Sequence, residues 1–209
     1  IKNENVLVVW SDKVFMETSI VGAETSDLML TMGTVLELAK DVNPNELIDN
    51  RAAYNNYAVW VPVRNDDGTY SKKLTLISEH KKVYEGYMPL TKENISKVVF
   101  SALGNTYGWG GSLNSDDCSG YMRNVYKCFG MELARNTTWQ SSMPMAKVNM
   151  QYMPKEEKIK FFDALPFGTI LYFSGHEMMY LGERNGKYYV ISAVGTIMQP
   201  ENPSVRQRI

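Results

Sequence analysis

Short apolar segments, several of them alternating with polar residues, dominate the first part of the chain and predict β-strands. The predicted strands are Asn5–Trp10, Thr34–Leu38, Tyr57–Arg64 and Lys73–Ser78. Asp67 and Gly68 are typical of a hairpin turn between the last two. The polar, Asn-rich stretch Val42–Tyr54 is expected to form a long connection with room for a helical turn. This part of the chain is therefore predicted to be a small β-domain.

The hydrophobic period changes in the second part of the chain, where apolar residues recur at the three- to four-residue spacing of helices. One predicted helix is capped by Thr91, has its apolar face between Ile95 and Ala102 and closes at Gly104. A second has its apolar face between Tyr121 and Phe129 and ends before Gly130. Strands are predicted at Gly168–Tyr180 and Lys187–Ala193, with Asn185 and Gly186 as a hairpin turn between them. Helices followed by a sheet indicate an α+β fold.

Composition narrows the classes of protein to which this chain can belong. Its 209 residues, 44% of them hydrophobic, suit two small domains, which we place at residues 1–88 and 89–209. The formal net charge of −1 gives no reason to expect binding to nucleic acid or to an anionic membrane. No apolar run is long enough to span a bilayer. Because the chain starts at Ile1 and lacks a signal-peptide pattern, its N-terminus is interpreted as processed or truncated.

Cys118 falls at the start of the second predicted helix and is the strongest candidate for a nucleophile. Unpaired N–H groups and the positive end of the helix dipole favour a thiolate in the first helical turn. Its neighbours Asp117 and Ser119 are polar, although a cysteine buried only for packing remains an alternative. Cys128, late in the same helix, is interpreted as structural. With two cysteines and two histidines, the chain is expected to hold neither a disulfide framework nor a structural metal site.

A nucleophilic cysteine needs a base, and the chain offers His80 and His176. His176 follows an apolar strand segment and begins another, whereas His80 lies in a polar run and is interpreted as exposed surface. Ser192, beyond the next hairpin, is the polar residue best placed to orient the imidazole. Cys118 and His176 therefore form the candidate catalytic dyad.

Four groups of residues occur in an order and spacing that resemble the NlpC/P60 family of bacterial cell-wall cysteine peptidases. They are Tyr107–Gly111, Asp117–Gly120, Leu133–Asn136 with Gln140, and Gly175–His176 leading into Tyr180–Gly182. The similarity covers residues 89–200, and the preceding segment is similar to the bacterial SH3-like domain that often precedes this catalytic domain. The resemblance implies a papain-like, NlpC-type α+β catalytic domain preceded by a small SH3-like β-barrel.

The resemblance also implies a role for particular residues. The implied catalytic residues are Cys118, His176, Ser192 and Tyr107, and the implied substrate-binding residues are Asp117, Ser119, Arg135 and Trp109. By similarity, Asp117 and Tyr107 match positions that bind the free amine of an L-Ala-γ-D-Glu stem. Ser119 and Arg135 match positions near the substrate carboxylate, to which a bidentate arginine is chemically suited. The other interpretation of Arg135 is a surface salt bridge.

Ser192 departs from the family pattern, which usually has histidine and sometimes asparagine or glutamine at this position. A hydroxyl can still form a hydrogen bond with the imidazole, but it carries no charge. Reduced activity, or a different orienting residue, is therefore an alternative that the sequence leaves open.

The resemblance implies hydrolysis of the bond between γ-D-Glu and a diamino acid in peptidoglycan stem peptides or muropeptides. The reaction would run through a thioester on Cys118 and would need no metal or cofactor. Two alternatives remain: N-acetylmuramoyl-L-alanine amidase activity, and a catalytically impaired cell-wall-binding module. Asp117 and Arg135 favour the peptidase, because they suit a substrate with a free amine and a carboxylate. The resemblance also implies a secreted, periplasmic or envelope-associated protein, which we expect to be a monomer.

Overall fold

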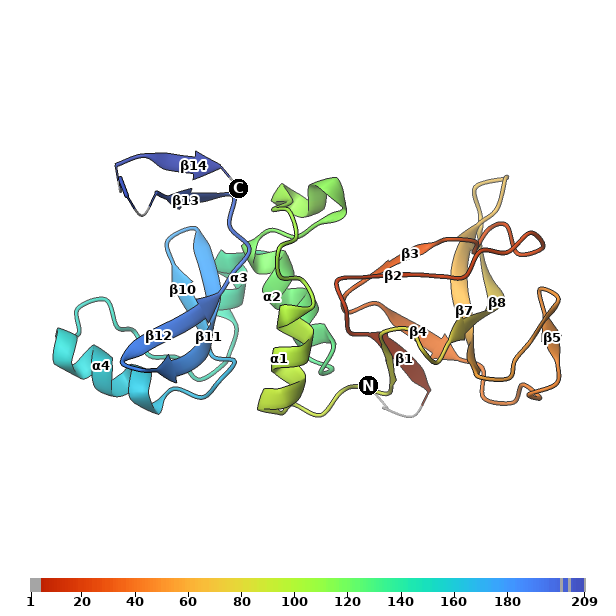
Figure 1. The fold of residues 1–209 in the computed structure, drawn as a ribbon, viewed down its shortest axis with the longest axis horizontal. Coiled ribbons are helices and arrows are strands. Elements are labelled where there is room, and N and C mark those ends of the chain that lie inside the picture. The colour runs from red at the N-terminus through yellow and green to blue at the C-terminus, as the bar shows by residue number, and fades with distance from the viewer. Residues whose placement is uncertain (1–4, 200, 203, 209) are drawn as a thin grey trace. The chain divides into compact units, whose positions relative to one another are not determined.

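The computed structural model describes residues 5–199, 201–202 and 204–208, which divide into two compact units (Figure 1). The N-terminal unit runs to Ala102 and also includes Asn124–Met131. The C-terminal unit comprises Leu103–Arg123 and the chain from Glu132 onward. Helices and antiparallel sheets occupy separate stretches of the chain, so the predicted α+β class is confirmed.

An antiparallel five-stranded sheet forms the centre of the N-terminal unit, in the order β8-β7-β4-β1-β9. Its strands are β1 (Val6–Val9), β4 (Val35–Leu38), β7 (Asn56–Arg64), β8 (Tyr70–Ser78) and β9 (Val83–Glu85). Two short hairpins add β2 (Lys13–Phe15) with β3 (Met29–Thr31), and β5 (Leu47–Ile48) with β6 (Arg51–Ala52). The four strands predicted from the sequence correspond to β1, β4, β7 and β8, whereas the SH3-like character of this unit stays a prediction.

The core of the N-terminal unit explains why these strands form. Alternate residues of several strands are buried together, including Leu7, Leu36, Val59 and Ile77. Burial of this apolar surface is the main stabilising contribution to such a sheet. The helical turn allowed for within residues 42–54 is not formed, because Asp49 and Asn50 adopt positive φ angles of 50° and 61° and close the β5–β6 hairpin instead.

Helix α1 (Lys92–Phe100) begins where the sequence predicts a cap. The Thr91 hydroxyl accepts a hydrogen bond from the Asn94 N–H at 3.2 Å, and Ile95, Val98 and Val99 form the buried face. Helix α2 (Cys118–Lys127) likewise follows the predicted pattern. The positions of both helices therefore follow from the spacing of their apolar residues, and the start of α1 also follows from its cap.

The C-terminal unit contains an antiparallel three-stranded sheet in the order β10-β11-β12. Its strands are β10 (Ile170–Phe173), β11 (His176–Arg184) and β12 (Lys187–Ile191). Asn185 and Gly186 have φ angles of 56° and 74°, as the predicted hairpin turn requires. The chain then forms a further hairpin of β13 (Thr196–Met198) and β14 (Arg206–Arg208), which the sequence pattern does not predict.

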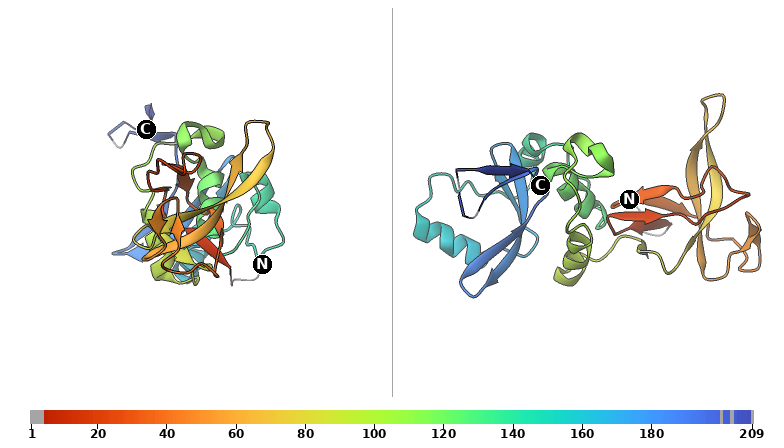
Figure 2. Two further views of the ribbon diagram at one scale, coloured as in Figure 1. Left: turned by 90° about the vertical axis from the view of Figure 1, so that its right-hand side faces the viewer. Right: turned by 45° about the horizontal axis from the view of Figure 1, so that its top comes forward.

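Three smaller helices complete the C-terminal unit: the 3-10 helix η1 (Trp109–Asn114), α3 (Thr137–Ser142) and α4 (Lys155–Ala164). Helix α4 lies beside β11, as Figures 1 and 2 show. The Tyr180 hydroxyl donates to the Phe162 carbonyl at 2.8 Å, and the Tyr188 hydroxyl donates to the Asp163 carboxylate at 2.6 Å. Two tyrosines of the sheet therefore anchor the end of this helix.

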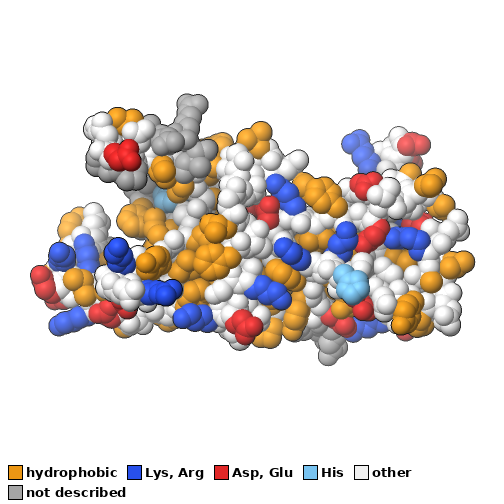
Figure 3. Space-filling model, viewed as in Figure 1, with side chains coloured by type: hydrophobic (Ala, Val, Ile, Leu, Met, Phe, Trp, Pro, Cys, Tyr) orange, Lys and Arg blue, Asp and Glu red, His pale blue; other side chains and the backbone are white. Residues whose placement is uncertain are grey.

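Charged side chains of both signs are mixed over the face drawn in Figure 3, as the near-zero net charge leads one to expect. Among the helices that the structure describes, none is both long and apolar enough to cross a membrane.

Candidate active site

Cys118 is the first residue of helix α2, and Asp117 caps that helix. The Asp117 carboxylate accepts from the Gly120 N–H at 2.7 Å, and the Asp117 carbonyl accepts from the Tyr121 N–H at 2.9 Å. The N–H of Cys118 belongs to the first turn and so has no partner within the helix. The Cys118 side chain is 8% exposed and lies where the helix dipole favours negative charge.

Asp117 and Arg135 form a bidentate ion pair, with Arg135 Nη1 3.0 Å and Nη2 2.8 Å from the two carboxylate oxygens. The Ser119 hydroxyl joins this pair, because it donates to Asp117 at 3.2 Å and accepts from Arg135 at 3.3 Å. Burial raises the pKa of Asp117, but Arg135 and the amides of Gly120 and Gly110 outweigh burial and lower it. The structure thus brings together Asp117, Ser119 and Arg135, three of the predicted substrate-binding residues.

The phenol of Tyr107 is affected electrostatically by Cys118 and Asp117. Burial raises the pKa of the Tyr107 phenol, and the charges of Cys118 and Asp117 raise it further. The phenol is therefore protonated at neutral pH and can donate a hydrogen bond. The ring packs against Gly195, where an added Cβ would lie 3.0 Å from Tyr107 Cδ1.

Trp109 begins the loop between Tyr107 and Asp117, and its side chain is 79% exposed. Gly110 and Gly111 follow with φ angles of 66° and 91°, a conformation that favours glycine. The Gly110 N–H donates to the second Asp117 oxygen at 3.0 Å. Asp117 therefore fixes both the helix start and the loop that carries Trp109.

Ser192 holds the imidazole of His176. Ser192 Oγ lies 2.9 Å from His176 Nε2 and 2.9 Å from the carbonyl oxygen of Glu177. The carbonyl can only accept, so the single Ser192 proton goes to Glu177 and the Ser192 oxygen accepts from the Nε2–H of His176. Burial lowers the pKa of His176, which favours the neutral ring. The network thus assigns the ring proton to Nε2 and leaves the lone pair on Nδ1.

The thiol itself has a different neighbour. Within the part of the chain that the structure describes, Cys118 Sγ has Thr137 Oγ1 as its hydrogen-bonding partner, at 3.9 Å, and no hydrogen bond joins it to His176. The catalytic dyad therefore stays a prediction. Ser192, in contrast, lies against His176 as the sequence leads one to expect.

Sequence reasoning missed two residues of this site. Thr137 is the first residue of α3, behind the Asn136 cap, and Glu177 follows His176 on β11 with no exposed surface. Glu177 and the equally buried Met179 occupy alternate positions of the strand and so share a face. An acidic residue on the apolar face of a strand is a signal that could have identified Glu177.

The other cysteine and histidine lie where the sequence predicts. Cys128 has no exposed surface, its Sγ lies 3.5 Å from the carbonyl oxygens of Val9 and Asn124, and burial raises its pKa to about 12. His80 is exposed. The structural interpretation of Cys128 is thus confirmed.

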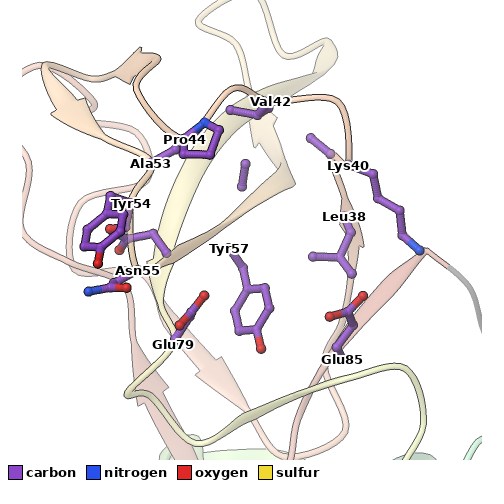
Figure 4. A pocket seen from close by; sticks show the side chains of 13 residues that line it. Leu38, Lys40, Val42, Pro44, Ala53, Tyr54, Asn55, Tyr57, Glu79 and Glu85 are labelled. Atoms are coloured by element: carbon purple, nitrogen blue, oxygen red, sulfur yellow. The ribbon is translucent and has the colours of Figure 1, made fainter.

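A cavity of about 500 Å³ lies in the N-terminal unit, lined in part by Tyr54, Tyr57, Glu79 and Glu85 (Figure 4). Burial raises the pKa of Tyr57, and the charges of Glu79 and Glu85 add to this effect. No residue of the predicted site lines this cavity. Among the described residues there is also no group of three or more His, Cys, Asp or Glu side chains that could hold a metal ion.

Comparison with known proteins places this site in a family. The NlpC/P60 family model matches residues 104–196. Dipeptidyl-peptidase 6 of Lysinibacillus sphaericus is 28% identical over 105 residues, which are 50% of this chain and 33% of that protein.

Two solved structures are similar in fold. An NlpC/P60 endopeptidase from Photobacterium damselae subsp. piscicida superposes with a TM-score of 0.69 at 18% identity, over 98% of this chain and 44% of that one. An NlpC/P60 family protein from Bacillus cereus gives a TM-score of 0.53 at 19% identity, over 91% of this chain and 58% of that one. The chain thus spans between a third and somewhat over half of the length of these proteins. The chain therefore contains an NlpC/P60 family domain over residues 104–196, which include Cys118 and His176.

Proposed function

We propose that this protein is a cysteine endopeptidase that hydrolyses peptidoglycan stem peptides between γ-D-Glu and a diamino acid. The observation that carries the proposal is the 2.9 Å contact between Ser192 Oγ and His176 Nε2, which orients a neutral imidazole as a base. Cys118 at the capped start of α2 supports it, because that position favours a thiolate. Membership of the NlpC/P60 family supports the peptidase class.

The proposed reaction begins with transfer of the Cys118 thiol proton to Nδ1 of His176, the nitrogen left with a lone pair. The thiolate attacks the carbonyl carbon of the scissile amide, and negative charge develops on the carbonyl oxygen. Catalytic hydrogen bonds often tighten only when substrate binds, so the absence of a contact between Cys118 and His176 among the described residues is compatible with this step.

Two donors can stabilise the tetrahedral oxyanion. One is the Cys118 N–H, which has no partner within helix α2. The other is the Tyr107 hydroxyl, which a raised pKa keeps protonated. As the C–N bond breaks, His176 returns its proton to the leaving amine and a thioester on Cys118 remains. Water then attacks the thioester with His176 as base, releasing the carboxylic acid and the free thiol.

For substrate binding, the geometry supports Arg135 more strongly than Asp117. The two Asp117 oxygens already accept hydrogen bonds from Gly120, Ser119, Gly110 and Arg135. An ammonium group would have to share those oxygens, whereas the guanidinium has five N–H donors and its side chain is 40% exposed. We therefore propose that Arg135 binds the substrate carboxylate, that Asp117 and Ser119 hold Arg135 in place, and that Trp109 offers an exposed aromatic surface.

The occupied Asp117 carboxylate is also the observation that favours a second candidate, N-acetylmuramoyl-L-alanine amidase activity. An amidase substrate carries no free amine at the cleaved end, so it does not require Asp117 as a ligand. In either case we propose action on the cell wall outside the membrane, the usual location of this family, with the N-terminal unit as an SH3-like domain.

Incubating the whole chain with L-Ala-γ-D-Glu-diamino-acid peptides, with and without the muramyl group, tests both candidates by mass spectrometry of the products. Release of L-Ala-γ-D-Glu by the protein but not by Cys118→Ala is the expected result. Release of the intact stem peptide from its muramyl group would support the amidase instead. If the folded protein, with its cysteines reduced, cleaves neither bond, both activities are rejected and the wall-binding alternative replaces them.

A further inference from the structure

Glu177 is a buried carboxylic acid to which the proposed reaction gives no role. Its side chain has no exposed surface, and within the described chain neither carboxyl oxygen makes a hydrogen bond of standard geometry. It follows His176 on β11, and its backbone carbonyl accepts the Ser192 hydrogen bond. Burying a charged carboxylate without partners is costly, so the neutral acid is favoured at this position.

Thr137 contacts the nucleophile and affects the ionisation of Glu177, although no hydrogen bond of standard geometry joins Thr137 to Glu177 in this structure. The Thr137 hydroxyl lies 3.9 Å from Cys118 Sγ. Burial raises the pKa of Glu177 to about 7, and the nearby Thr137 hydroxyl opposes part of that rise. A threonine hydroxyl has one proton, so it can donate to the carboxyl or to the sulfur, but not to both.

We propose that Glu177 is a positioning residue that controls the Cys118 thiolate through the Thr137 hydroxyl, with the neutral acid as the supporting form. The inference rests on the proposed function, because it takes Cys118 as the nucleophile. A protonated Glu177 donates to Thr137 Oγ1, which leaves the Thr137 proton free to donate to the thiolate. An ionised Glu177 takes the Thr137 proton for itself. The thiolate then loses a donor and gains a negative charge nearby.

The pKa values of the two titratable groups nearest to Glu177 in the site are both shifted downward, whereas that of Glu177 is raised. Asp117, at the start of α2, has a lowered pKa and stays ionised, and its charge raises the pKa of Glu177. Burial lowers the pKa of His176, the preceding residue on β11, which favours its neutral form. Tyr172 lies opposite Glu177 in register on β10. Glu177 is thus the carboxyl whose ionisation near neutral pH can alter the thiol.

The test is the rate at which iodoacetamide alkylates Cys118 in the whole chain, measured from pH 5.5 to 9 by mass spectrometry of the Cys118 peptide. Glu177→Gln keeps the shape of the side chain and donates permanently to Thr137. We expect equal rates for wild type and Glu177→Gln at pH 5.5. Above the pH at which Glu177 ionises, we expect the variant to react about tenfold faster, because a neighbouring charge shifts a pKa by about one unit. Coincident profiles for the two proteins would overturn the proposal.

Variants of Thr137 show whether Glu177 acts on Cys118 through the Thr137 hydroxyl, here called the Glu177 relay, or only through its charge. Thr137→Val removes the hydroxyl, and the Glu177→Gln effect is expected to shrink in that background, whereas Thr137→Ser should preserve it. Glu157→Gln removes an exposed carboxylate of the same unit and should leave the profile unchanged. A Glu177→Gln effect of equal size with and without Thr137 would exclude the relay. Circular dichroism of each variant verifies that it is folded.

Alkylation does not depend on peptide cleavage, so the two proposals can fail separately. A shifted alkylation profile in a protein that cleaves no stem peptide would uphold the Glu177 relay and reject the proposed function. Cleavage that depends on Cys118, together with coincident alkylation profiles, would uphold the proposed function and reject the Glu177 relay.

Discussion

The two ends of helix α2 each present a cysteine, and the difference between them shows how a helix end determines what a thiol can do. Cys118 occupies the N-terminal end, beside the hydroxyl of Thr137 and the ion pair of Asp117 and Arg135. Cys128 follows the C-terminal end, and burial raises its pKa to about 12. Burial therefore favours the unreactive thiol form of Cys128, whereas Cys118 lies among the polar groups that the proposed reaction uses.

Replacing each cysteine by alanine should give the largest contrast. Cys118→Ala is expected to lower kcat/KM for stem-peptide cleavage about ten-thousand-fold or more, because the nucleophile is lost. Cys128→Ala should keep that activity and lose about 1 kcal/mol of unfolding free energy, since it leaves a small cavity in a packed core. Steady-state kinetics and urea unfolding of both variants measure the two effects. Substantial loss of specific activity in folded Cys128→Ala would break the comparison.

Glu177 should make the free energy of unfolding depend on pH, because folding raises its pKa. Its pKa is about 7 in the folded protein and 4.5 as an ordinary carboxyl, so the folded state binds the proton more tightly. The resulting stability is fully present below pH 4.5 and is lost as the pH rises through 7. Relative to Glu177→Gln, wild type should therefore lose about 3 kcal/mol between pH 4.5 and 8. Urea unfolding at several pH values measures this difference, and a constant difference would contradict it.

Ser192→Ala tests the proposed base, His176, without changing Cys118 or Cys128. Loss of the hydroxyl removes the acceptor for His176 Nε2–H and frees the ring to change tautomer. We expect kcat/KM to fall about 10- to 100-fold, the range typical of removing an orienting partner of a catalytic histidine. Ser192→Thr should restore most of it. Unchanged kinetics in Ser192→Ala would show that another group orients the imidazole.

Residues with a local signature were predictable from the sequence. The capping Thr91, the apolar face of α1, the turn at Asn185 and Gly186, and Cys118 at a helix start all depend on neighbours a few residues away. Their positions follow from periodicity and turn chemistry alone. The α+β order of the second part of the chain was accessible for the same reason.

Contacts between distant segments were not predictable. The pairing of Arg135 with Asp117 occupies two residues that the sequence assigned to separate substrate groups. The approach of Thr137 to both Cys118 and Glu177 joins three elements of the chain, and no local pattern reports it. Such contacts depend on how the helices pack against the sheet. That packing is determined by the whole fold and not by any short segment of the sequence.

Two glycines that pack on tyrosine rings offer the smallest and most closely matched test. An added Cβ would lie 3.1 Å from the ring of Tyr87 at Gly130, just beyond Cys128, and 3.0 Å from the ring of Tyr107 at Gly195. Gly130→Ala also places a side chain at a φ of 76°, so it should cost about 1 kcal/mol of unfolding free energy without changing kcat/KM. Gly195→Ala should instead displace the Tyr107 hydroxyl from the oxyanion and lower kcat by a few-fold to about tenfold, with KM little changed. Tyr107→Phe in the same background should then have less effect than it has alone, because the hydroxyl is already misplaced. Equal kinetic effects of the two glycine substitutions would mean that the proposed division of roles between the ends of α2 does not hold.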